Sequence, residues 1–303
     1  MPRDHIWQQI SSLLGSAENS ITLIAPFIKK DTFKEILEIV PAGVEDIRCV
    51  TRWSVPEIAA GVSDPEIIDL MEFDKRIKIY LCHSLHAKLY IADGRCLIGS
   101  ANLTGKATGR VSASNIEVLI ESETSHQEIQ RLLATVEAHS IVATSDLAQQ
   151  LREQADLLRE DDDAPMLVVP EQQEPSRRWM PETRRPERLY QVYNGKYGSV
   201  GSDVLAAVLR DLAELDIAPG LSLEPFKEAV RGRLLLIPEL ADLRDTGRLN
   251  MKDARDELIA RSGCTSEQAQ RSVETLAEWL WHFDEVHLVP VGAWEIRQGR
   301  EIT

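Results

Sequence analysis

One stretch of the sequence carries side chains whose types and spacing suit chemistry on a phosphate group. It reads His86-Ala-Lys88-Leu-Tyr-Ile-Ala-Asp93, followed by Gly99-Ser100-Ala-Asn102. Residues two apart on a strand point to the same face, so the His86 imidazole and the Lys88 ammonium emerge together and can converge on one anion. Gly99 permits close approach of the backbone, and the Ser100 hydroxyl and the Asn102 amide add donors for phosphate oxygens.

A second polar group follows further along the chain. Asn115 and Glu117 are two residues apart, so on a strand they share a face. There Glu117 can accept a hydrogen bond from one nitrogen of a histidine and hold the other nitrogen toward a substrate, and Asn115 is a candidate substrate contact. Lys106 and Arg110, in the loop GKATGR, are candidates for contact with substrate phosphates, and a solvated loop explains them equally well.

The surrounding pattern predicts an α/β layer that would hold these groups. Strand signals alternate with helix signals, an order that favours a largely parallel sheet, and Thr32 with Glu35 forms a capping box that predicts a helix start. The turn pair Asp93-Gly94 predicts a tight hairpin between His86–Ala92 and Arg95–Ile98. Further strands are expected at Ile21–Ile28, Ile47–Trp53, Ile77–Cys82 and Ile116–Ile120, and a long helix at Asp146–Glu160.

The polar residues resemble the signature of the phospholipase D superfamily, which is His-x-Lys, four residues, Asp, and later Gly-Ser-x-Asn. His86, Lys88, Asp93, Gly99, Ser100 and Asn102 match six of its positions within 17 residues. The APFI, TRW and LHAKLYI segments resemble the nuclease branch with one such motif per chain, which includes restriction endonucleases. The resemblance covers about residues 1–160, and it implies an α/β fold with a mixed sheet flanked by helices.

The same resemblance implies phosphodiester transfer through a covalent phosphohistidine, with no metal and no cofactor. One neutral imidazole attacks phosphorus, and a second, protonated imidazole gives its proton to the leaving oxygen. Lys88 and Asn102 would stabilise the charge on the phosphoryl oxygens, and Asp93 would be mainly structural.

Two imidazoles are needed, and the chain has a single His-x-Lys. The economical solution is a homodimer in which both copies of His86 meet at one active site on the twofold axis.

The spacing before Ser100 departs from the family pattern. Five residues separate Asp93 from Gly99, whereas the family usually has six. A strict two-residue hairpin pairs Lys88 with Gly99 and turns Ser100 to the face opposite His86. For Ser100 to lie in the active site, the hairpin therefore needs a bulge or a wider turn, or the chain must leave the strand at Gly99.

Charge and proline content suggest where the domains divide. The 303 residues carry 34 Lys and Arg against 49 Asp and Glu, a net charge of −15, and the hydrophobic fraction of 43% excludes wholesale disorder. We expect domains at 1–160 and 201–303, joined by a proline-rich charged linker at 161–200. Basic residues in that linker either track a nucleic-acid backbone or are simply solvated; they include Arg177, Arg178, Arg184 and Arg185.

The C-terminal part is predicted to be mainly helical. Its order of helix, turn, helix and hairpin fits a winged helix-turn-helix, with Gln268 and Arg271 near the start of the last helix, where base edges would be met. Residues 201–303 carry 12 basic and 19 acidic groups, and this negative charge disfavours binding to the phosphate backbone of a nucleic acid. Protein contact or dimerisation explains this helix at least as well.

Together these features predict a metal-independent, homodimeric nuclease that cleaves DNA, with RNA also possible as substrate. A partner protein or guide would deliver the substrate to so acidic a protein, which fits defence against foreign DNA, a context that only the resemblance suggests. No secretory signal and no bilayer-spanning apolar run is visible, so we expect a cytosolic protein without membrane contact. The alternatives are a phospholipase or phosphatidyltransferase, and a non-catalytic subunit of a larger nucleic-acid-processing assembly.

Overall fold

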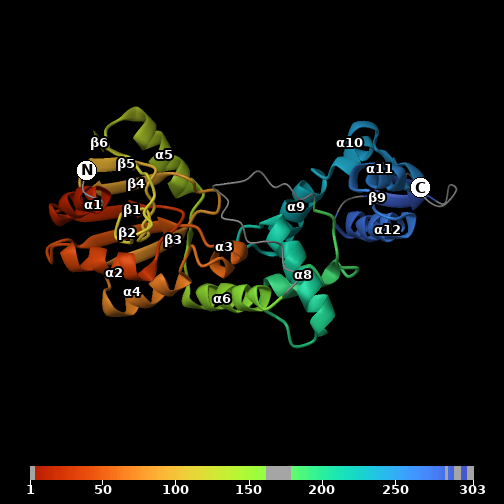
Figure 1. Cartoon of the computed structure of the whole chain (residues 1–303), viewed down its shortest axis with the longest axis horizontal. Helices are drawn as coiled ribbons and strands as arrows, with labels where there is room; N and C mark the ends of the chain where they lie inside the picture. Colours follow the sequence, from red (N-terminus) through yellow and green to blue (C-terminus); the bar gives the residue numbers. More distant parts are fainter. Residues whose placement is uncertain (1–3, 162–178, 284–285, 290–294, 299–303) are drawn as a thin grey trace. The chain divides into compact units, whose positions relative to one another are not determined.

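The computed structural model describes residues 4–161, 179–283, 286–289 and 295–298 (Figure 1). Contacts within the chain divide it into two compact units, Met1–Asp156 and Leu157–Thr303. The division falls inside helix α6 (Ser145–Arg159). Each unit is described by itself.

The first unit is built on a seven-stranded mixed sheet in the order β6-β5-β4-β1-β2-β3-β7. Strands β1, β2 and β3 are parallel to one another, as the alternating pattern predicts, while the pairings that involve β4 to β7 are antiparallel. The expectation of a largely parallel sheet is therefore wrong outside β1, β2 and β3, and the mixed sheet is confirmed. The strands are β1 (Ser20–Ile24), β2 (Asp46–Thr51), β3 (Ile77–Leu81), β4 (Lys88–Ala92), β5 (Arg95–Gly99), β6 (Leu119–Glu123) and β7 (Ile141–Val142).

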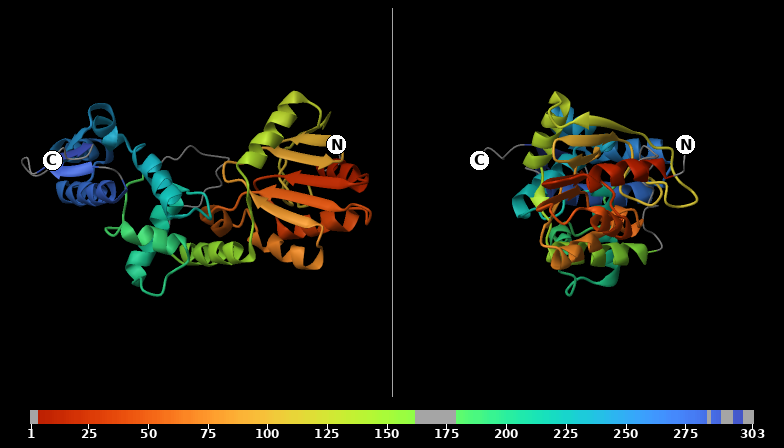
Figure 2. Two further views of the ribbon diagram at one scale, coloured as in Figure 1. Left: turned by 180° about the vertical axis from the view of Figure 1, so that it is seen from behind. Right: turned by 90° about the vertical axis from the view of Figure 1, so that its left-hand side faces the viewer.

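Helices bury both faces of this sheet, which can be followed in Figure 1 and Figure 2. Helix α5 (Gln127–Ala138) packs Ile129 and Val136 against Leu89 and Ile91 of β4. Helix α1 (His5–Gly15) contacts β4 and β5 on the other face, where Leu13 and Leu97 line one hollow. Because β4 is covered on both faces, all five of its residues are buried. The remaining helices are α2 (Lys30–Ile39), α3 (Val55–Ala59), α4 (Leu70–Phe73) and the 3₁₀ turn Pro65–Asp69.

Helix α2 begins earlier than its predicted capping box. Its first residue is Lys30, whose backbone N–H donates to Asp64 Oδ2 at 2.8 Å, and Thr32 lies buried within the first turn. A carboxylate 34 residues away thus binds the first amide of the helix, and the capping box predicted at Thr32 and Glu35 does not mark the helix start.

The last elements of the second unit follow the order predicted for a winged helix-turn-helix. Helices α10 (Ala241–Thr246), α11 (Met251–Ser262) and α12 (Ser266–Phe283) are followed by the antiparallel pair β9 and β10. A short strand after α10 joins them in a sheet of order β8-β10-β9. The strands are β8 (Arg248–Asn250), β9 (Val286–Val289) and β10 (Glu295–Gln298), and helices α7 (Glu187–Tyr193), α8 (Ser202–Leu215) and α9 (Leu223–Leu234) precede them.

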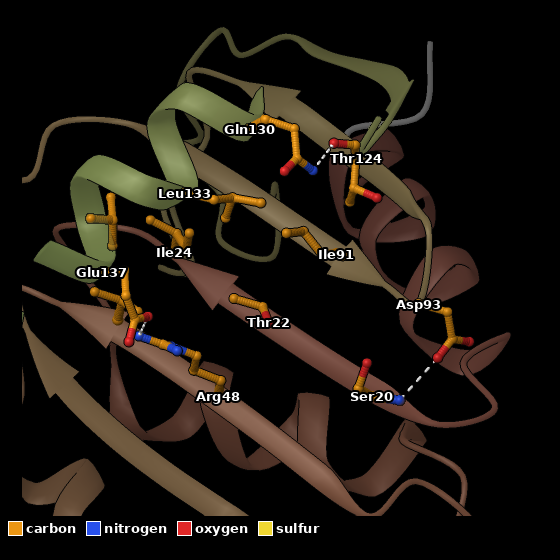
Figure 3. Close-up of a pocket in the computed structure, with 12 residues that line it drawn as sticks. Ser20, Thr22, Ile24, Arg48, Ile91, Asp93, Thr124, Gln130, Leu133 and Glu137 are labelled. Carbon is orange, nitrogen blue, oxygen red and sulfur yellow. Dashed lines mark hydrogen bonds and ion pairs between the residues drawn. The ribbon is translucent and has the colours of Figure 1, made fainter. Parts of the chain in front are cut away.

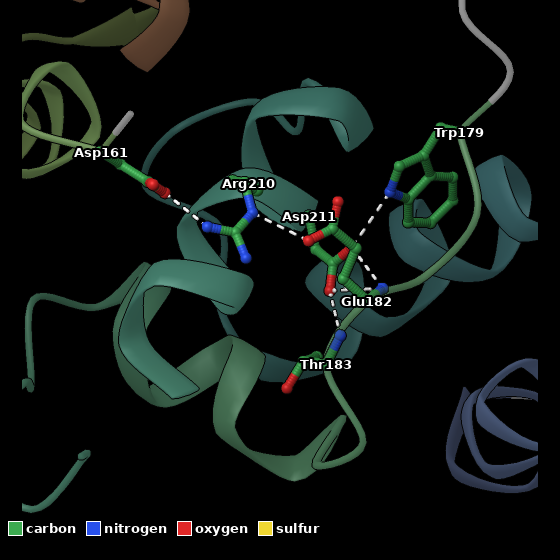
Figure 4. Close-up of polar contacts among 6 residues, drawn as sticks. All are labelled: Asp161, Trp179, Glu182, Thr183, Arg210 and Asp211. Atoms are coloured by element: carbon green, nitrogen blue, oxygen red, sulfur yellow. Dashed lines mark hydrogen bonds and ion pairs between the residues drawn. The ribbon is translucent and has the colours of Figure 1, made fainter. Parts of the chain in front are cut away.

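Residues 179–200 belong to this unit and do not form the extended linker that we predicted. The buried Asp211 carboxylate of α8 accepts hydrogen bonds from Trp179 Nε1, Glu182 N and Thr183 N, at 3.1, 2.9 and 2.8 Å (Figure 4). The Thr183 carbonyl accepts from Trp279 Nε1 at 2.8 Å. The prolines of this segment suggested solvated backbone, but a buried carboxylate binds its free amides. The remainder of the expected linker, residues 162–178, lies outside the described residues.

Asp211 makes the stability of the second unit depend on pH. Burial raises the pKa of its carboxyl to about 7, although the three donors act in the opposite direction. An unfolded Asp has a pKa of about 3.9, so between about pH 4 and pH 7 the folded state binds more protons than the unfolded state, and stability falls as pH rises. We expect Asp211→Asn to reduce the difference in unfolding free energy between pH 5 and pH 8, by on the order of 2 kcal/mol.

Urea denaturation at the two pH values measures this difference. Asp253→Asn, which replaces an exposed Asp of α11, is the matched control and should keep the wild-type pH dependence. Equal pH dependence in wild type and Asp211→Asn would show that Asp211 does not titrate in this range.

Candidate functional site

The His-x-Lys pair lies at the end of the sheet where the parallel strands finish. Strand β4 is antiparallel to β1, and Leu89 pairs with Ile24, so the start of β4 lies beside the end of β1. His86 precedes β4 and is exposed, whereas Lys88, its first residue, is only 6% exposed. The flanking Leu85 and Leu89 are buried and anchor this segment. An exposed histidine therefore lies two residues before a nearly buried lysine.

The hairpin has the strict register, and β5 ends just before Ser100. Lys88 pairs with Gly99, and β5 ends at that glycine. Beyond it, the Ser100 N–H donates to the Val118 carbonyl at 3.0 Å, and the Ser100 hydroxyl donates to Glu117. The strand β5 thus ends at Gly99, which was one of the three possibilities left by the spacing, and Ser100 contacts Glu117; its place in the active site stays a prediction.

Glu117 and Asn115 are also close, although neither lies on a strand. Strand β6 starts at Leu119, later than the predicted strand. Even so, Asn115 Nδ2 donates to Glu117 Oε1 at 3.1 Å, and Glu117 Oε2 accepts from the Ser100 hydroxyl. The carboxylate is thereby held in place on both oxygens, at the same end of the sheet as Lys88.

Gly99 is required at the junction of these elements. A Cβ atom built on it would lie 1.9 Å from the Val118 carbonyl oxygen and 2.8 Å from its carbon. Any other residue would push β6 away from β5 just where Ser100 meets Glu117.

Asn102 is fixed by the segment that follows β1. Its Oδ1 accepts from the Phe27 N–H at 3.3 Å, and its side chain is 6% exposed. The neighbouring Leu103 exchanges backbone hydrogen bonds with Phe27 and Lys29. Tyr90 is buried and lies two residues after Lys88 on β4. Its hydroxyl donates to the Ala101 carbonyl, and burial raises the pKa of Tyr90. The Asn102 side chain is thus held by Phe27, and the backbone on either side of it is held by the segment after β1 and by β4.

Arg110 and Lys106, the two predicted contacts for substrate phosphates, lie in the loop that follows Asn102. The Arg110 guanidinium donates to both carboxylate oxygens of Glu35, at 2.7 and 2.8 Å, and lies 4.6 Å from the centre of the Trp7 ring. These contacts join the loop to α2 and α1, and a substrate contact of Arg110 stays a prediction. Lys106 has an exposed side chain, and its carbonyl accepts from the Asn115 N–H at 3.1 Å, so it remains a candidate substrate contact.

Asp93 lies at the opposite end of β4 from His86. Its carboxylate accepts from the backbone N–H groups of Glu18, Asn19 and Ser20, at 2.8, 3.0 and 2.9 Å. These hydrogen bonds, that of Glu18 foremost, hold the pKa of Asp93 below its ordinary value. The contacts tie the hairpin turn to the start of β1, which agrees with the structural role that the resemblance implies.

Asp93 also borders a hollow between α5 and the sheet, of about 340 Å³ (Figure 3). Its polar groups are engaged with each other: Arg48 pairs with Glu137, and Gln130 donates to the Thr124 carbonyl. His86, Lys88 and Asn102 do not line it. We therefore place the candidate site at the other end of the sheet.

The nucleic-acid contacts predicted for the second unit have mixed outcomes. Arg177 and Arg178 lie outside the described residues, and Arg184 and Arg185 are exposed just before α7. Gln268 caps α12, since its Oε1 accepts from the Thr265 N–H at 3.0 Å, and Arg271 pairs with Glu267 on the same helix. The exposed face of α12 also carries Glu274 and Glu278, so it is acidic.

Arg52 is a residue of this region that the sequence reasoning missed. It follows β2 directly, and its side chain donates to the carbonyl of Leu85, the residue before His86. The available signal was a cation placed right after a buried parallel strand, at the end of a sheet where ligand sites form.

The part of the chain that the structure describes has neither a metal-ligand cluster nor a helix suited to span a membrane. Within it, no three His, Cys, Asp or Glu side chains are grouped as a metal site would require. None of its helices combines the length and apolarity needed to cross a bilayer.

Comparison with known proteins gives one family match and several structural similarities, the latter all of low sequence identity. Residues 10–139 match a family model described as cardiolipin synthase, PLD-like domain. NucT from Helicobacter pylori is similar in structure at 17% identity and a TM-score of 0.35, covering 45% of this chain and 88% of that chain. The phospholipase D family member Nuc from Salmonella typhimurium is similar at 18% identity and a TM-score of 0.35, covering 46% and 91%.

Phosphatidylserine synthase from Haemophilus influenzae is similar at 12% identity and a TM-score of 0.35, covering 52% of this chain and 42% of that chain. No curated protein matches the sequence. The match over residues 10–139 contains every position of the motif from His86 to Asn102. The N-terminal unit of this chain belongs to the phospholipase D superfamily.

Proposed function

We propose that this protein is a metal-independent phosphodiesterase of the nuclease type that hydrolyses DNA through a phosphohistidine formed on His86. One observation carries the proposal: an exposed imidazole stands two residues before a buried lysine, at the sheet end where Ser100, Asn102 and Glu117 are each held by hydrogen bonds. These are the groups required to attack phosphorus and to stabilise the phosphoryl oxygens.

The reaction would proceed in two displacements. A neutral His86 nitrogen attacks phosphorus and forms a P–N bond, while the P–O bond to the leaving nucleoside breaks and its oxygen takes a proton from a second imidazole. That imidazole, now neutral, removes a proton from water as the water oxygen attacks phosphorus and the P–N bond breaks. Lys88 and Asn102 stabilise the negative charge on the non-bridging oxygens in both steps.

The second imidazole would be His86 of the partner subunit, in a homodimer with one shared site. An apolar strip beside the site supports this assembly. Ile116 is fully exposed, and Val118 and Ile120 are 55% and 62% exposed, on either side of Glu117 and at the start of the edge strand β6. Exposed apolar side chains gathered in one place mark contact surfaces, and this surface adjoins the candidate site.

The second unit would serve recognition or assembly. Arg184 and Arg185 are its candidates for contact with a nucleic-acid backbone, whereas the acidic α12 suits contact with protein. With a net charge of −15, the protein would depend on a partner protein or guide to bring the substrate. A cytosolic role in defence against foreign DNA completes this proposal.

A lipid substrate is the second candidate, because the matching family model is described as cardiolipin synthase. The same residues would then transfer a phosphatidyl group. The net charge of −15 opposes binding to anionic bilayers and places this candidate second.

One set of assays separates the candidates. Purified protein is incubated with DNA, RNA and phosphatidylcholine vesicles, each with and without EDTA, beside His86→Ala. We expect cleavage of DNA that survives EDTA and disappears in the variant. Cleavage of RNA alone, or turnover of phosphatidylcholine alone, would replace DNA as the substrate. No turnover of any of the three would favour a non-catalytic subunit.

A further inference from the structure

Arg52 joins three segments at the candidate site. It is the first residue after β2, and its guanidinium makes a two-pronged contact with Glu57, with Nε donating to Oε2 at 3.1 Å and Nη2 to Oε1. Its Nη1 donates to the Leu85 carbonyl at 3.0 Å. The guanidinium also lies 5.4 Å from the centre of the Phe27 ring, in the segment that holds Asn102.

The Leu85 carbonyl belongs to the peptide group that supplies the backbone N–H of His86. A hydrogen bond to this carbonyl therefore fixes the plane from which the His86 side chain departs. Such support matters because His86 is exposed, and within the described residues of the single chain its ring makes no hydrogen bond or ion pair. The preceding turn adds one more contact, from Leu85 N to the Cys82 carbonyl at 3.0 Å.

The contact with Leu85 depends on the fork of an arginine. Glu57 is 4% exposed and engages two nitrogens of Arg52, which leaves Nη1 directed at the carbonyl. The Arg52 carbonyl is itself held by the Ser63 hydroxyl at 3.1 Å. A lysine keeps the charge but has one nitrogen, so it cannot bind both carboxylate oxygens and the carbonyl in this geometry.

We propose that Arg52, oriented by Glu57, is a positioning residue for His86. It aligns the imidazole for attack through the peptide group of Leu85 and His86. This inference rests on the proposed function of His86, and it adds a residue outside the family's motif to the machinery.

Arg52→Lys tests the proposal, with Arg76→Lys as the matched control. Arg76 has the same kind of network, a paired Asp74 and Nη1 donating to the Pro41 and Val44 carbonyls, but it precedes β3 at the opposite end of the parallel strands. With DNA as substrate, we expect Arg52→Lys to lower kcat by about 10- to 100-fold while KM changes by less than about threefold. Arg76→Lys should change neither, even if both variants lower Tm equally.

A second readout needs no activity. In ¹H–¹⁵N spectra of the full-length protein, the signal of the His86 backbone amide is assigned by comparison with the spectrum of His86→Gln. This signal should shift and broaden in Arg52→Lys and stay unchanged in Arg76→Lys. If the wild type cleaves no phosphodiester, the proposed function fails while this spectrum still tests the positioning. An unchanged His86 amide, or a raised KM with unchanged kcat, would overturn the proposal, the latter because Arg52 would then contact substrate directly.

Discussion

Replacement of His86 by alanine is expected to lower phosphodiester hydrolysis by about 10⁴-fold or more, because it removes the atom that bonds to phosphorus. The side chain is exposed and makes no hydrogen bond within the described residues, so the fold should not suffer. We therefore expect the Tm of His86→Ala to match that of the wild type. His139→Ala, which replaces an exposed histidine at the end of α5, is the matched control and should keep full turnover.

Mixing the two proteins tests whether the site is shared. If each site requires His86 from both subunits, equal amounts of wild type and His86→Ala that exchange freely form about one quarter wild-type dimers. The rate should then fall to about one quarter of that of wild type at the same total concentration. A rate of about one half would show that each copy works alone, as would light scattering that finds an active monomer.

The arrangement of the hairpin was predictable because it depends on neighbouring residues. The turn pair Asp93-Gly94 closes a two-residue loop, and that loop pairs Lys88 with Gly99, as observed. The position of Ser100 was not predictable in this way. It depends on Val118 and Glu117, which lie 18 and 17 residues further along the chain.

Other differences have the same physical origin, since each involves a polar group supplied by a distant segment. Asp64 binds the first amide of α2 in place of the predicted cap, and Asp211 binds the amides of residues predicted to be solvated linker. Arg52 reaches Leu85 across 33 residues of sequence. Periodicity predicts which element forms, whereas the partners of buried polar groups depend on packing between elements.

Gly99→Ala is the second change with a large expected effect. The added methyl group would lie 1.9 Å from the Val118 carbonyl oxygen and 3.0 Å from the Leu119 Cα, and both are backbone atoms that no side-chain rotation can move aside. The start of β6 must shift, and with it the hydrogen bonds of Ser100 to Val118 and Glu117. We expect kcat to fall by about 100-fold and the unfolding free energy by about 1–3 kcal/mol.

Gly94→Ala supplies the comparison within the same hairpin. A Cβ atom on Gly94 meets nothing within 4 Å, so this variant should retain turnover and lose little stability. Urea denaturation and steady-state kinetics on both variants separate the two contributions. If Gly99→Ala unfolds more easily but keeps its kcat, the junction with Val118 supports only the sheet. If kcat also falls, in conditions where the variant is fully folded, then this close backbone contact sets the geometry of Ser100 and Glu117 at the active site.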